Sequence, residues 1–152
     1  MRSSSRTDVR LVLNILPLNA RAAVVRTMNP NHRFLVVDDF APMREIIRKV
    51  LQEIGYEHIQ QANDGAVALP LLQASPFDML ITDWNMPRLP GIELLRAVRA
   101  EPKLASLPVL MVTAEVKREQ IIAATQAGVN GYIIKPFTAQ ALAAKVQKIL
   151  HG

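Results

Sequence analysis

The sequence contains no cysteine, so disulfide bonds, thiolate metal sites and cysteine nucleophiles are all excluded. It also lacks any apolar run near the roughly 18 residues that a membrane-spanning helix needs. Both absences fit a soluble protein of a reducing compartment, and we predict a cytoplasmic location. The 152 residues, 50% of them hydrophobic, suffice for one domain with a substantial core and leave no room for a second folded module.

Basic residues outnumber acidic ones, but the excess is concentrated at one end of the chain. The formal net charge is +5, and residues 1–28 contribute +4 of it through five arginines and a single aspartate. The rest of the chain is nearly neutral, with 13 basic and 12 acidic residues. It therefore lacks the single-sign surface that binding to a nucleic-acid backbone requires, and we predict no nucleic-acid partner.

Residues 1–30 form a basic leader that differs from the rest of the sequence. The leader combines spaced arginines with Ser3-Ser4-Ser5 and an apolar patch over residues 11–18, which Asn14 and Pro17 interrupt. Three interpretations remain open: a disordered tail or misassigned start upstream of Met28, an accessory segment, and a targeting peptide. The domain itself is expected to span residues 31–152.

From Arg33 onward, short apolar runs of strand length alternate with stretches of helical period. The predicted strands are Phe34–Val37, His58–Gln61, Met79–Thr82, Val109–Val112 and Gly131–Ile134. The predicted helices are 43–54, Gly65–Ala74, Ile92–Arg99, Lys117–Ala127 and Ala139–Leu150. Pro70 lies inside the second helix and predicts a kink, because a missing amide donor there costs about 3 kcal/mol. The alternation indicates an α/β fold with a doubly wound, five-stranded parallel sheet and helices on both faces.

Polar side chains follow the predicted strands at one edge of that sheet. Asp38 and Asp39 come after the first strand, and Asp83 comes after the third. If these strands are neighbours, the carboxylates converge, and their repulsion raises at least one pKa unless a cation neutralises them. An all-oxygen site with few protein ligands suits Mg²⁺. Thr113 and Lys135 end two other strands and could hold phosphoryl oxygens, so the set indicates phosphoryl transfer onto an aspartate.

Each of these motifs also has a purely structural explanation. The two adjacent aspartates could cap the helix that follows them, and Asp83–Pro87 could be an ordinary turn. Thr113 could be a packing residue, Tyr132 a half-buried strand aromatic and Lys135-Pro136 a rigid loop. The order and spacing of the complete set favour the phosphoryl-transfer interpretation over this combination of separate explanations.

Four motifs make residues 34–150 similar to response regulator receiver domains. They are Val36-Val37-Asp38-Asp39, Asp83-Trp84-Asn85-Met86-Pro87, Val112-Thr113-Ala114 and Lys135-Pro136-Phe137. The resemblance implies a flavodoxin-like receiver fold with strand order 2-1-3-4-5. Two departures, Pro70 in the second helix and Pro90 where the family commonly has aspartate, lie outside the expected phosphoryl pocket.

The resemblance also implies a role for each residue of the site. Asp83 would be the phosphoacceptor. Mg²⁺ would be bound by the side chains of Asp39 and Asp83 and the carbonyl of Asn85, with Asp38 acting largely through water. The phosphoryl oxygens would be bound by the side chains of Lys135 and Thr113 and by the backbone N–H groups of Asn85 and Ala114.

A switch and a partner surface follow from the same resemblance. Movement of Thr113 toward the phosphoryl group would make room for Tyr132 to rotate inward. The expected partner face lies on the last two helices and the last strand and comprises Val116, Arg118, Ile121, Tyr132 and Lys145. With no room for an attached effector, output would pass through this face.

Within the family, the sequence most resembles regulators of chemotaxis. This implies a monomeric single-domain response regulator that a histidine kinase phosphorylates and a flagellar motor switch protein recognises, with a phosphatase as a further partner. It implies no enzyme acting on a separate substrate.

One alternative is a single-domain phosphate shuttle or sink in a phosphorelay. An aspartyl-phosphate phosphatase is less favoured because Asp38 and Asp39 are adjacent instead of forming a D-x-D pattern, and a flavin domain because no glycine-rich loop follows the first strand.

Overall fold

The structure, a computed structural model, describes residues 29–114 and 117–151. Within these ranges five strands alternate with five helices. The strands are β1 (Arg33–Val37), β2 (His58–Ala62), β3 (Met79–Asp83), β4 (Val109–Thr113) and β5 (Gly131–Ile134). The helices are α3 (Ala41–Ile54), α4 (Gly65–Ala74), α5 (Gly91–Ala100), α6 (Arg118–Ala127) and α7 (Ala139–His151). The predictions for residues 1–28 and for Val116 concern positions outside the described residues.

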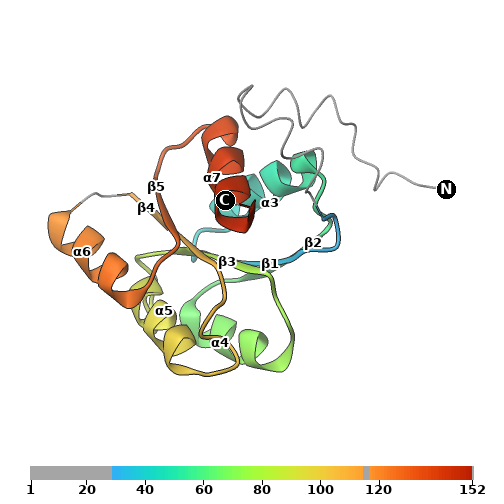
Figure 1. The fold of residues 1–152 in the computed structure, drawn as a ribbon. Helices are drawn as coiled ribbons and strands as arrows, with labels where there is room; N and C mark the ends of the chain where they lie inside the picture. Colours follow the sequence, from blue (N-terminus) through green and yellow to red (C-terminus); the bar gives the residue numbers. More distant parts are fainter. Residues whose placement is uncertain (1–28, 115–116, 152) are drawn as a thin grey trace.

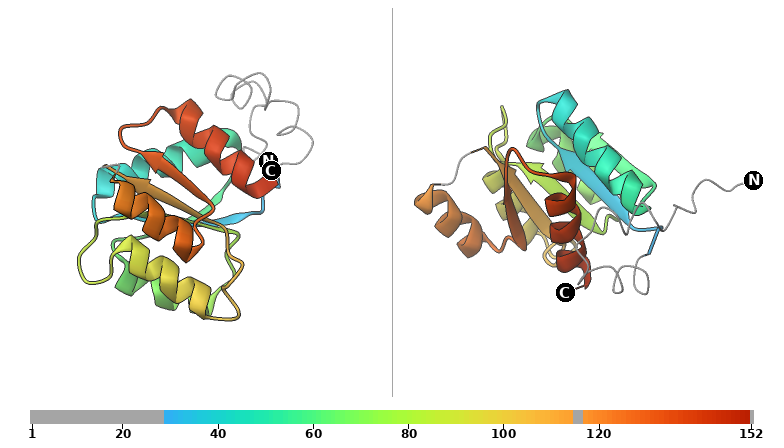
Figure 2. Two further views of the ribbon diagram at one scale, coloured as in Figure 1. Left: turned by 60° about the vertical axis from the view of Figure 1, so that its left-hand side comes forward. Right: turned by 90° about the horizontal axis from the view of Figure 1, so that it is seen from above.

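The five strands run parallel in one sheet of order β2-β1-β3-β4-β5. Helices α3 and α7 cover one face, and α4, α5 and α6 cover the other (Figures 1 and 2). A helix connects each strand to the next, as parallel pairing requires, because the chain must cross back along the sheet before it can run in the same direction again. The predicted doubly wound, flavodoxin-like arrangement and its strand order are confirmed.

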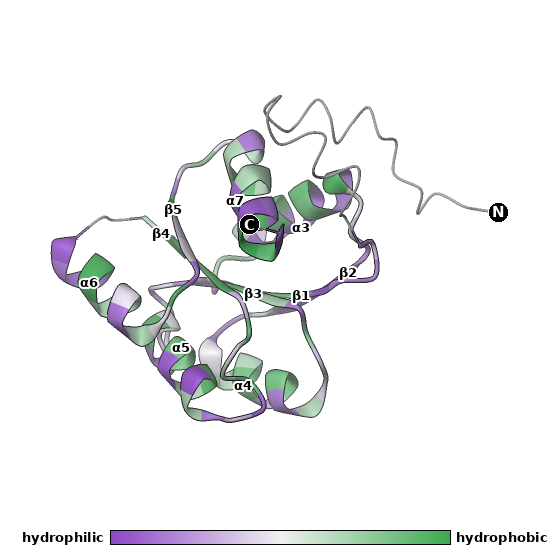
Figure 3. Cartoon of the chain, viewed as in Figure 1, coloured by the Kyte–Doolittle hydropathy of each residue, from purple (hydrophilic) through white to green (hydrophobic). Residues whose placement is uncertain are grey.

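Apolar side chains fill both layers between the sheet and its helices. Strands β3 and β4 are buried throughout and β1 beyond its first residue, because helices cover the sheet on both sides. Figure 3 shows apolar residues concentrated along these central strands. Phe34 and Leu51 lie in the layer beneath α3 and α7, whereas Leu35 and Leu94 lie in the layer beneath α4, α5 and α6. This double burial explains why the strands are continuous apolar runs in the sequence.

The ends of the helices follow local signals in the sequence. Helix α3 ends before Gly55, whose φ of 126° lies where residues with side chains are rarely found. Helix α4 begins after Asp64, whose Oδ1 accepts a hydrogen bond from the Val67 N–H at 3.0 Å. The helix then continues through Pro70 to Ala74. In the part of the chain that the structure describes, no helix is long and apolar enough to cross a bilayer.

Strands β1 and β3 are neighbours in the sheet although β2 lies between them in the sequence. After β1 the chain enters α3 on one face, and after β3 it enters α5 on the opposite face. The two connections therefore leave the sheet in opposite directions at the carboxyl ends of adjacent strands. In doubly wound sheets, this reversal of strand order is where binding sites form.

Candidate functional site

Three carboxylates converge at this reversal point. Asp38 and Asp39 follow β1, Asp83 is the last residue of β3, and each contributes an oxygen lying within 4.8 Å of the others. Asp38 and Asp83 are buried, with 1% and 7% of their surface exposed, whereas Asp39 is exposed. The parallel register explains the convergence, because Val37 pairs with Thr82, so the next residues along the two segments are Asp38 and Asp83. The cluster therefore combines one solvated carboxylate with two buried ones.

Lys135 bridges the two buried carboxylates. Its Nζ lies 2.9 Å from Asp38 Oδ2 and 3.2 Å from Asp83 Oδ1. The residue follows β5, and its backbone N–H donates to the Thr113 carbonyl at 2.7 Å, which extends the pairing of β5 with β4 by one residue. The structure thus brings together four predicted site residues: Asp38, Asp39, Asp83 and Lys135.

The charges in the cluster shift the pKa values of its members. Burial raises the pKa of Asp83, as does the charge of Asp38, while Lys135 and the Trp84 backbone N–H oppose the shift only in part. Burial alone lowers the pKa of Lys135, but the hydrogen bonds and charges of Asp38 and Asp83 outweigh it and raise the value. One ammonium therefore does not neutralise three carboxylates. Oxygen ligands with excess negative charge and one solvent-exposed member are a donor set of the kind that Mg²⁺ binds.

The loop after β3 forms one wall of the site. Asn85, Met86, Pro87 and Pro90 line a cavity of about 330 Å³ together with Asp39. The loop closes tightly, with the Gly91 N–H donating to the Trp84 carbonyl at 2.9 Å. A Cβ atom at Gly91 would lie only 2.0 Å from the Asp83 carbonyl oxygen, so this position requires glycine. Pro90, the departure noted in the sequence, lines this cavity together with Asp39 and Asn85, two of the expected Mg²⁺ ligands, whereas Lys135 contacts Asp38 and Asp83.

Thr113 and Tyr132 lie on adjacent strands beside the cluster. Thr113 ends β4 and is fully buried, while Tyr132 lies half-buried on the edge strand β5. The Tyr132 hydroxyl is shielded from solvent without a hydrogen bond of normal geometry. Burial raises the pKa of Tyr132, and the hydrogen-bonding Thr113 side chain beside it opposes the shift. The two residues predicted to form the switch are therefore close enough to interact.

The helix-cap explanation for the two adjacent aspartates is wrong. The cap position of α3 is Phe40, and no side chain caps the helix there. Asp38 Oδ1 instead accepts a hydrogen bond from the Phe40 N–H at 2.8 Å, one residue before the helix starts. The carboxylate of Asp39 remains exposed and belongs to the acidic cluster.

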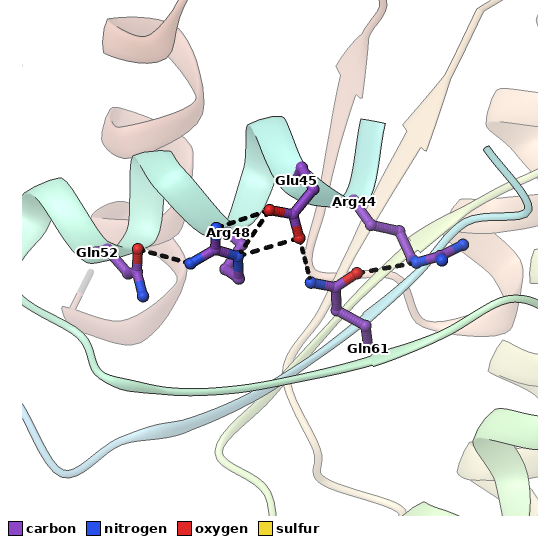
Figure 4. Close-up of polar contacts among 5 residues, drawn as sticks. All are labelled: Arg44, Glu45, Arg48, Gln52 and Gln61. Carbon is purple, nitrogen blue, oxygen red and sulfur yellow. Dashed lines mark hydrogen bonds and ion pairs between the residues drawn. The ribbon is translucent and has the colours of Figure 1, made fainter. Parts of the chain in front are cut away.

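Arg44 contacts the site although the sequence did not single it out. Its Nη1 donates to the carbonyl oxygen of Asp38 at 2.6 Å, and its Nε donates to Gln61 Oε1 at 2.9 Å. Figure 4 shows the second of these bonds within a chain of polar contacts that continues from Gln61 to Glu45 and Arg48. The only available signal was a basic residue in the first turn of the helix after the diacid, and such residues are common.

The residues predicted for the partner face lie on α6, β5 and α7. Arg118 and Lys145 are exposed, and Ile121 is 39% exposed, so none of the three belongs to the core. Two further apolar residues, Ile122 at 45% and Ile134 at 44%, are exposed on α6 and β5 and were missed in the sequence. Contiguous apolar patches mark surfaces that bind other proteins, and these isoleucines are candidates for such a patch on α6 and β5.

Comparison with known proteins gives one consistent result. The sequence profile described as the response regulator receiver domain matches residues 34–147. The chain is 59% identical to the chemotaxis protein CheY of Pseudomonas aeruginosa over 117 residues, which cover 77% of this chain and 94% of the relative. It is 55% identical to the chemotaxis protein CheY-3 of Vibrio cholerae over 122 residues, 80% of this chain and 94% of the relative.

Solved structures agree with these sequence matches. The chemotaxis response regulator CheY4 of Vibrio cholerae superposes with a TM-score of 0.74 at 34% identity, covering 79% of this chain and 99% of that one. The receiver domain of a sensor histidine kinase from Pseudomonas aeruginosa gives a TM-score of 0.73 at 25% identity, with 80% and 99% covered. That structure has a magnesium ion coordinated in its active-site cleft.

Proposed function

This chain belongs to the response regulator receiver domain family, and from that premise we propose that it is a phosphorylation-controlled binding module of chemotaxis. Asp83 accepts a phosphoryl group from a histidine kinase in a Mg²⁺-dependent reaction. The modified protein then binds a downstream partner, the flagellar motor switch protein. We place this activity in the cytoplasm. The chain is a phosphoacceptor that promotes its own modification and hydrolysis, and it is not an enzyme acting on a separate substrate.

One observation carries the proposal: Lys135 lies between Asp38 and Asp83 inside a cluster of three carboxylates. If Lys135 served only to neutralise a buried acid, one carboxylate partner would be enough. Here the ammonium contacts the proposed acceptor and a proposed cation ligand together, and the exposed Asp39 completes the cation site. A bound Mg²⁺ supplies positive charge that neutralises the carboxylates and the phosphoryl oxygens.

The chemical step is a displacement at phosphorus. A carboxylate oxygen of Asp83 attacks the phosphorus of a phosphohistidine, the P–O bond forms, and the P–N bond breaks. The departing imidazole nitrogen keeps the bonding electron pair and takes a proton from solvent. Lys135, Thr113 and the backbone N–H groups of Asn85 and Ala114 stabilise the charge on the phosphoryl oxygens. Lys135 already contacts the Asp83 carboxylate, so this group needs little reorganisation.

The switch relies on the contact between Thr113 and Tyr132. A phosphoryl group on Asp83 adds charge and acceptor oxygens, which draw the Thr113 hydroxyl toward the site and free space for Tyr132. Tyr132 lies on β5 between α6 and α7, so its position alters the face that carries Ile121. Inverting a 1:99 equilibrium to 99:1 takes about 5.5 kcal/mol, and a few charge-assisted hydrogen bonds supply energies of this order.

The proposal is tested by phosphorylation in solution. Trp84, the single tryptophan, adjoins Asp83 and reports on the site through its fluorescence. We expect Mg²⁺ to change this fluorescence and acetyl phosphate to change it again, with a phosphorylated species detected by intact mass. Asp83→Asn removes the second change and the mass increase, whereas Glu93→Gln, on the exposed surface of α5, retains both. Phosphorylation that persists in Asp83→Asn refutes the proposed acceptor.

The partner is tested separately. A peptide from the flagellar motor switch protein should bind more tightly to the phosphorylated protein than to the unmodified one. Phosphoryl transfer onward to a histidine-containing protein, without a gain in peptide affinity, would instead support the phosphorelay shuttle.

A further inference from the structure

The side chain of Arg44 links the backbone of the acidic cluster to strand β2. Its guanidinium donates Nη1 to the Asp38 carbonyl at 2.6 Å and Nε to Gln61 Oε1 at 2.9 Å. We propose that Arg44 is a positioning residue that fixes the peptide between Asp38 and Asp39 and thereby sets the affinity of the acidic cluster for a divalent cation. The inference rests on the proposed function, because it concerns the same cation site.

The peptide that Arg44 holds is the one that orients Asp39. A peptide unit is planar, so a hydrogen bond to the carbonyl of Asp38 also fixes the direction of the Asp39 N–Cα bond. The other polar groups of Asp38 are already engaged: its N–H donates to the Ala62 carbonyl at 3.2 Å, and its carboxylate accepts from Phe40 and Lys135. Without Arg44, the carbonyl of Asp38 loses its side-chain partner, and the Asp38–Asp39 peptide plane gains freedom to rotate.

Gln61 gives the Arg44 side chain a fixed position. Its Oε1 accepts from Arg44 and its Nε2 donates to Glu45 Oε2 at 2.8 Å, so reversing the amide would place two donors together and two acceptors together. Glu45 in turn accepts from Arg48, whose Nη1 donates to Gln52 at 2.8 Å (Figure 4). The chain of contacts links the end of β2 to the first turns of α3.

Glu45 is ionised at neutral pH. The hydrogen bond from Arg48, followed by that from Gln61, lowers the pKa of Glu45 to about 2. Its oxygens therefore accept hydrogen bonds from Arg48 and Gln61 at neutral pH. The hydrogen bonds of Gln61 with Arg44 and Glu45 are therefore both formed at this pH.

An effect of charge alone and an effect of positioning predict opposite changes in Mg²⁺ affinity when the Arg44 side chain is removed. The Arg44 guanidinium is positive and contacts the backbone of a cation-binding cluster, so its field repels a divalent cation. Removing that charge would strengthen Mg²⁺ binding if charge were its only contribution. Removing a residue that orients the ligands weakens binding, because loss of a supporting contact to a metal ligand typically reduces affinity by about 10-fold to 100-fold. The two explanations differ in sign.

The test is a Mg²⁺ titration of the full chain followed by Trp84 fluorescence. We expect Arg44→Gln to weaken Mg²⁺ binding by about 10-fold, and Arg44→Lys, which keeps the charge and one donor, to lose less. The matched control is Arg96→Gln on the surface of α5, which removes the same charge outside the Arg44 network and stays within about twofold of wild type, because salt screens distant charges. Arg44→Gln binding as tightly as wild type, or more tightly, overturns the proposal.

A second measurement needs no metal. Amide hydrogen exchange at Asp38 and Phe40 is expected to be about 10-fold faster in metal-free Arg44→Gln than in wild type, the equivalent of one hydrogen bond, and unchanged in Arg96→Gln. If wild type itself shows no response to Mg²⁺, the proposed function fails, and the exchange rates still decide whether Arg44 fixes the peptide. Equal exchange rates in wild type and Arg44→Gln overturn the positioning role on their own.

Discussion

The ammonium of Lys135 lies 2.9 Å from the carboxylate of Asp38, a residue 97 positions earlier in the chain. Asp38 is almost completely buried, and 18% of the Lys135 side chain is exposed. A buried carboxylate is stable only when hydrogen bonds and charges compensate the loss of water. This contact between the loops after β1 and β5 therefore contributes to the stability of the fold as well as to the proposed chemistry.

Replacing Lys135 by methionine leaves two buried carboxylates without their shared cation. We expect the unfolding free energy in the absence of divalent cations to fall by about 1–3 kcal/mol, the range for leaving a buried polar group unpaired. Urea unfolding in the presence of a chelator measures the change. Lys148→Met, in the last turn of α7, is the control and should unfold like wild type. Equal unfolding free energies for Lys135→Met and wild type would show that the contact contributes no stability.

The raised pKa of Asp83 makes stability depend on pH. Burial and the charge of Asp38 raise this pKa, so the native state binds the proton more tightly than the unfolded chain does. The protonated carboxyl therefore stabilises the fold at low pH, and this contribution is lost as pH rises from the unfolded value of about 4 through the higher folded value. Above that window Asp83 is ionised, and the folded state is less stable than it would be with a neutral side chain at this position.

Asp83→Asn, which has no proton to lose, should consequently be more stable than wild type at pH 7 without divalent cations. The difference in unfolding free energy between the two proteins should shrink as pH falls toward 4. Urea unfolding at several pH values in a chelator measures it, and Glu93→Gln on the surface of α5 serves as the control. A difference that is constant over this range would contradict the raised pKa.

The exposed isoleucine of α6 should matter for binding and not for phosphorylation. Ile121→Ser removes an apolar side chain that is 39% exposed on the proposed partner face. We expect the phosphorylated protein to bind the motor-switch peptide about 10-fold less tightly, the loss typical of an apolar residue at the centre of an interface. Modification by acetyl phosphate should be unchanged.

The control for this prediction is Ile46→Ser. Ile46 is 47% exposed on α3, which covers part of the opposite face of the sheet from α6, so it offers a similar change at a distant place (Figure 1). An equal loss of affinity in both variants would indicate a general effect of removing surface isoleucines, and unchanged affinity in Ile121→Ser would remove it from the partner face.

The acidic cluster could be predicted because parallel strands place their carboxyl ends at one edge. Asp38, Asp39 and Asp83 each follow an apolar run, and no knowledge of side-chain conformation was needed to expect them together. Neighbouring positions for β1 and β3 came from the family resemblance, since periodicity alone does not give strand order.

The contacts of Arg44 could not be predicted in the same way. Its partners, the carbonyl of Asp38 and the side chain of Gln61, lie 6 and 17 positions away, and reaching both depends on the rotamer of a long side chain. Exposure of Ile122 and Ile134 was missed for a related reason. An apolar residue in an amphipathic helix or edge strand has the same sequence pattern whether it is covered or not.

Gly91 allows the loop after β3 to return close to the end of that strand. A Cβ atom at this position would lie 2.0 Å from the Asp83 carbonyl oxygen, an atom of the backbone that cannot move without shifting the proposed acceptor. We expect Gly91→Ala to lower the unfolding free energy by about 3 kcal/mol, the upper part of the range for overpacking, and to slow modification by acetyl phosphate.

Gly131→Ala is the matched control. Its added Cβ would lie 2.6 Å from the terminal Cδ1 of Ile149, which can rotate away, so the loss of stability should be smaller and phosphorylation should be kept. If the two variants lose equal stability and both are modified at the wild-type rate, the close approach of Gly91 to Asp83 does not position the acceptor.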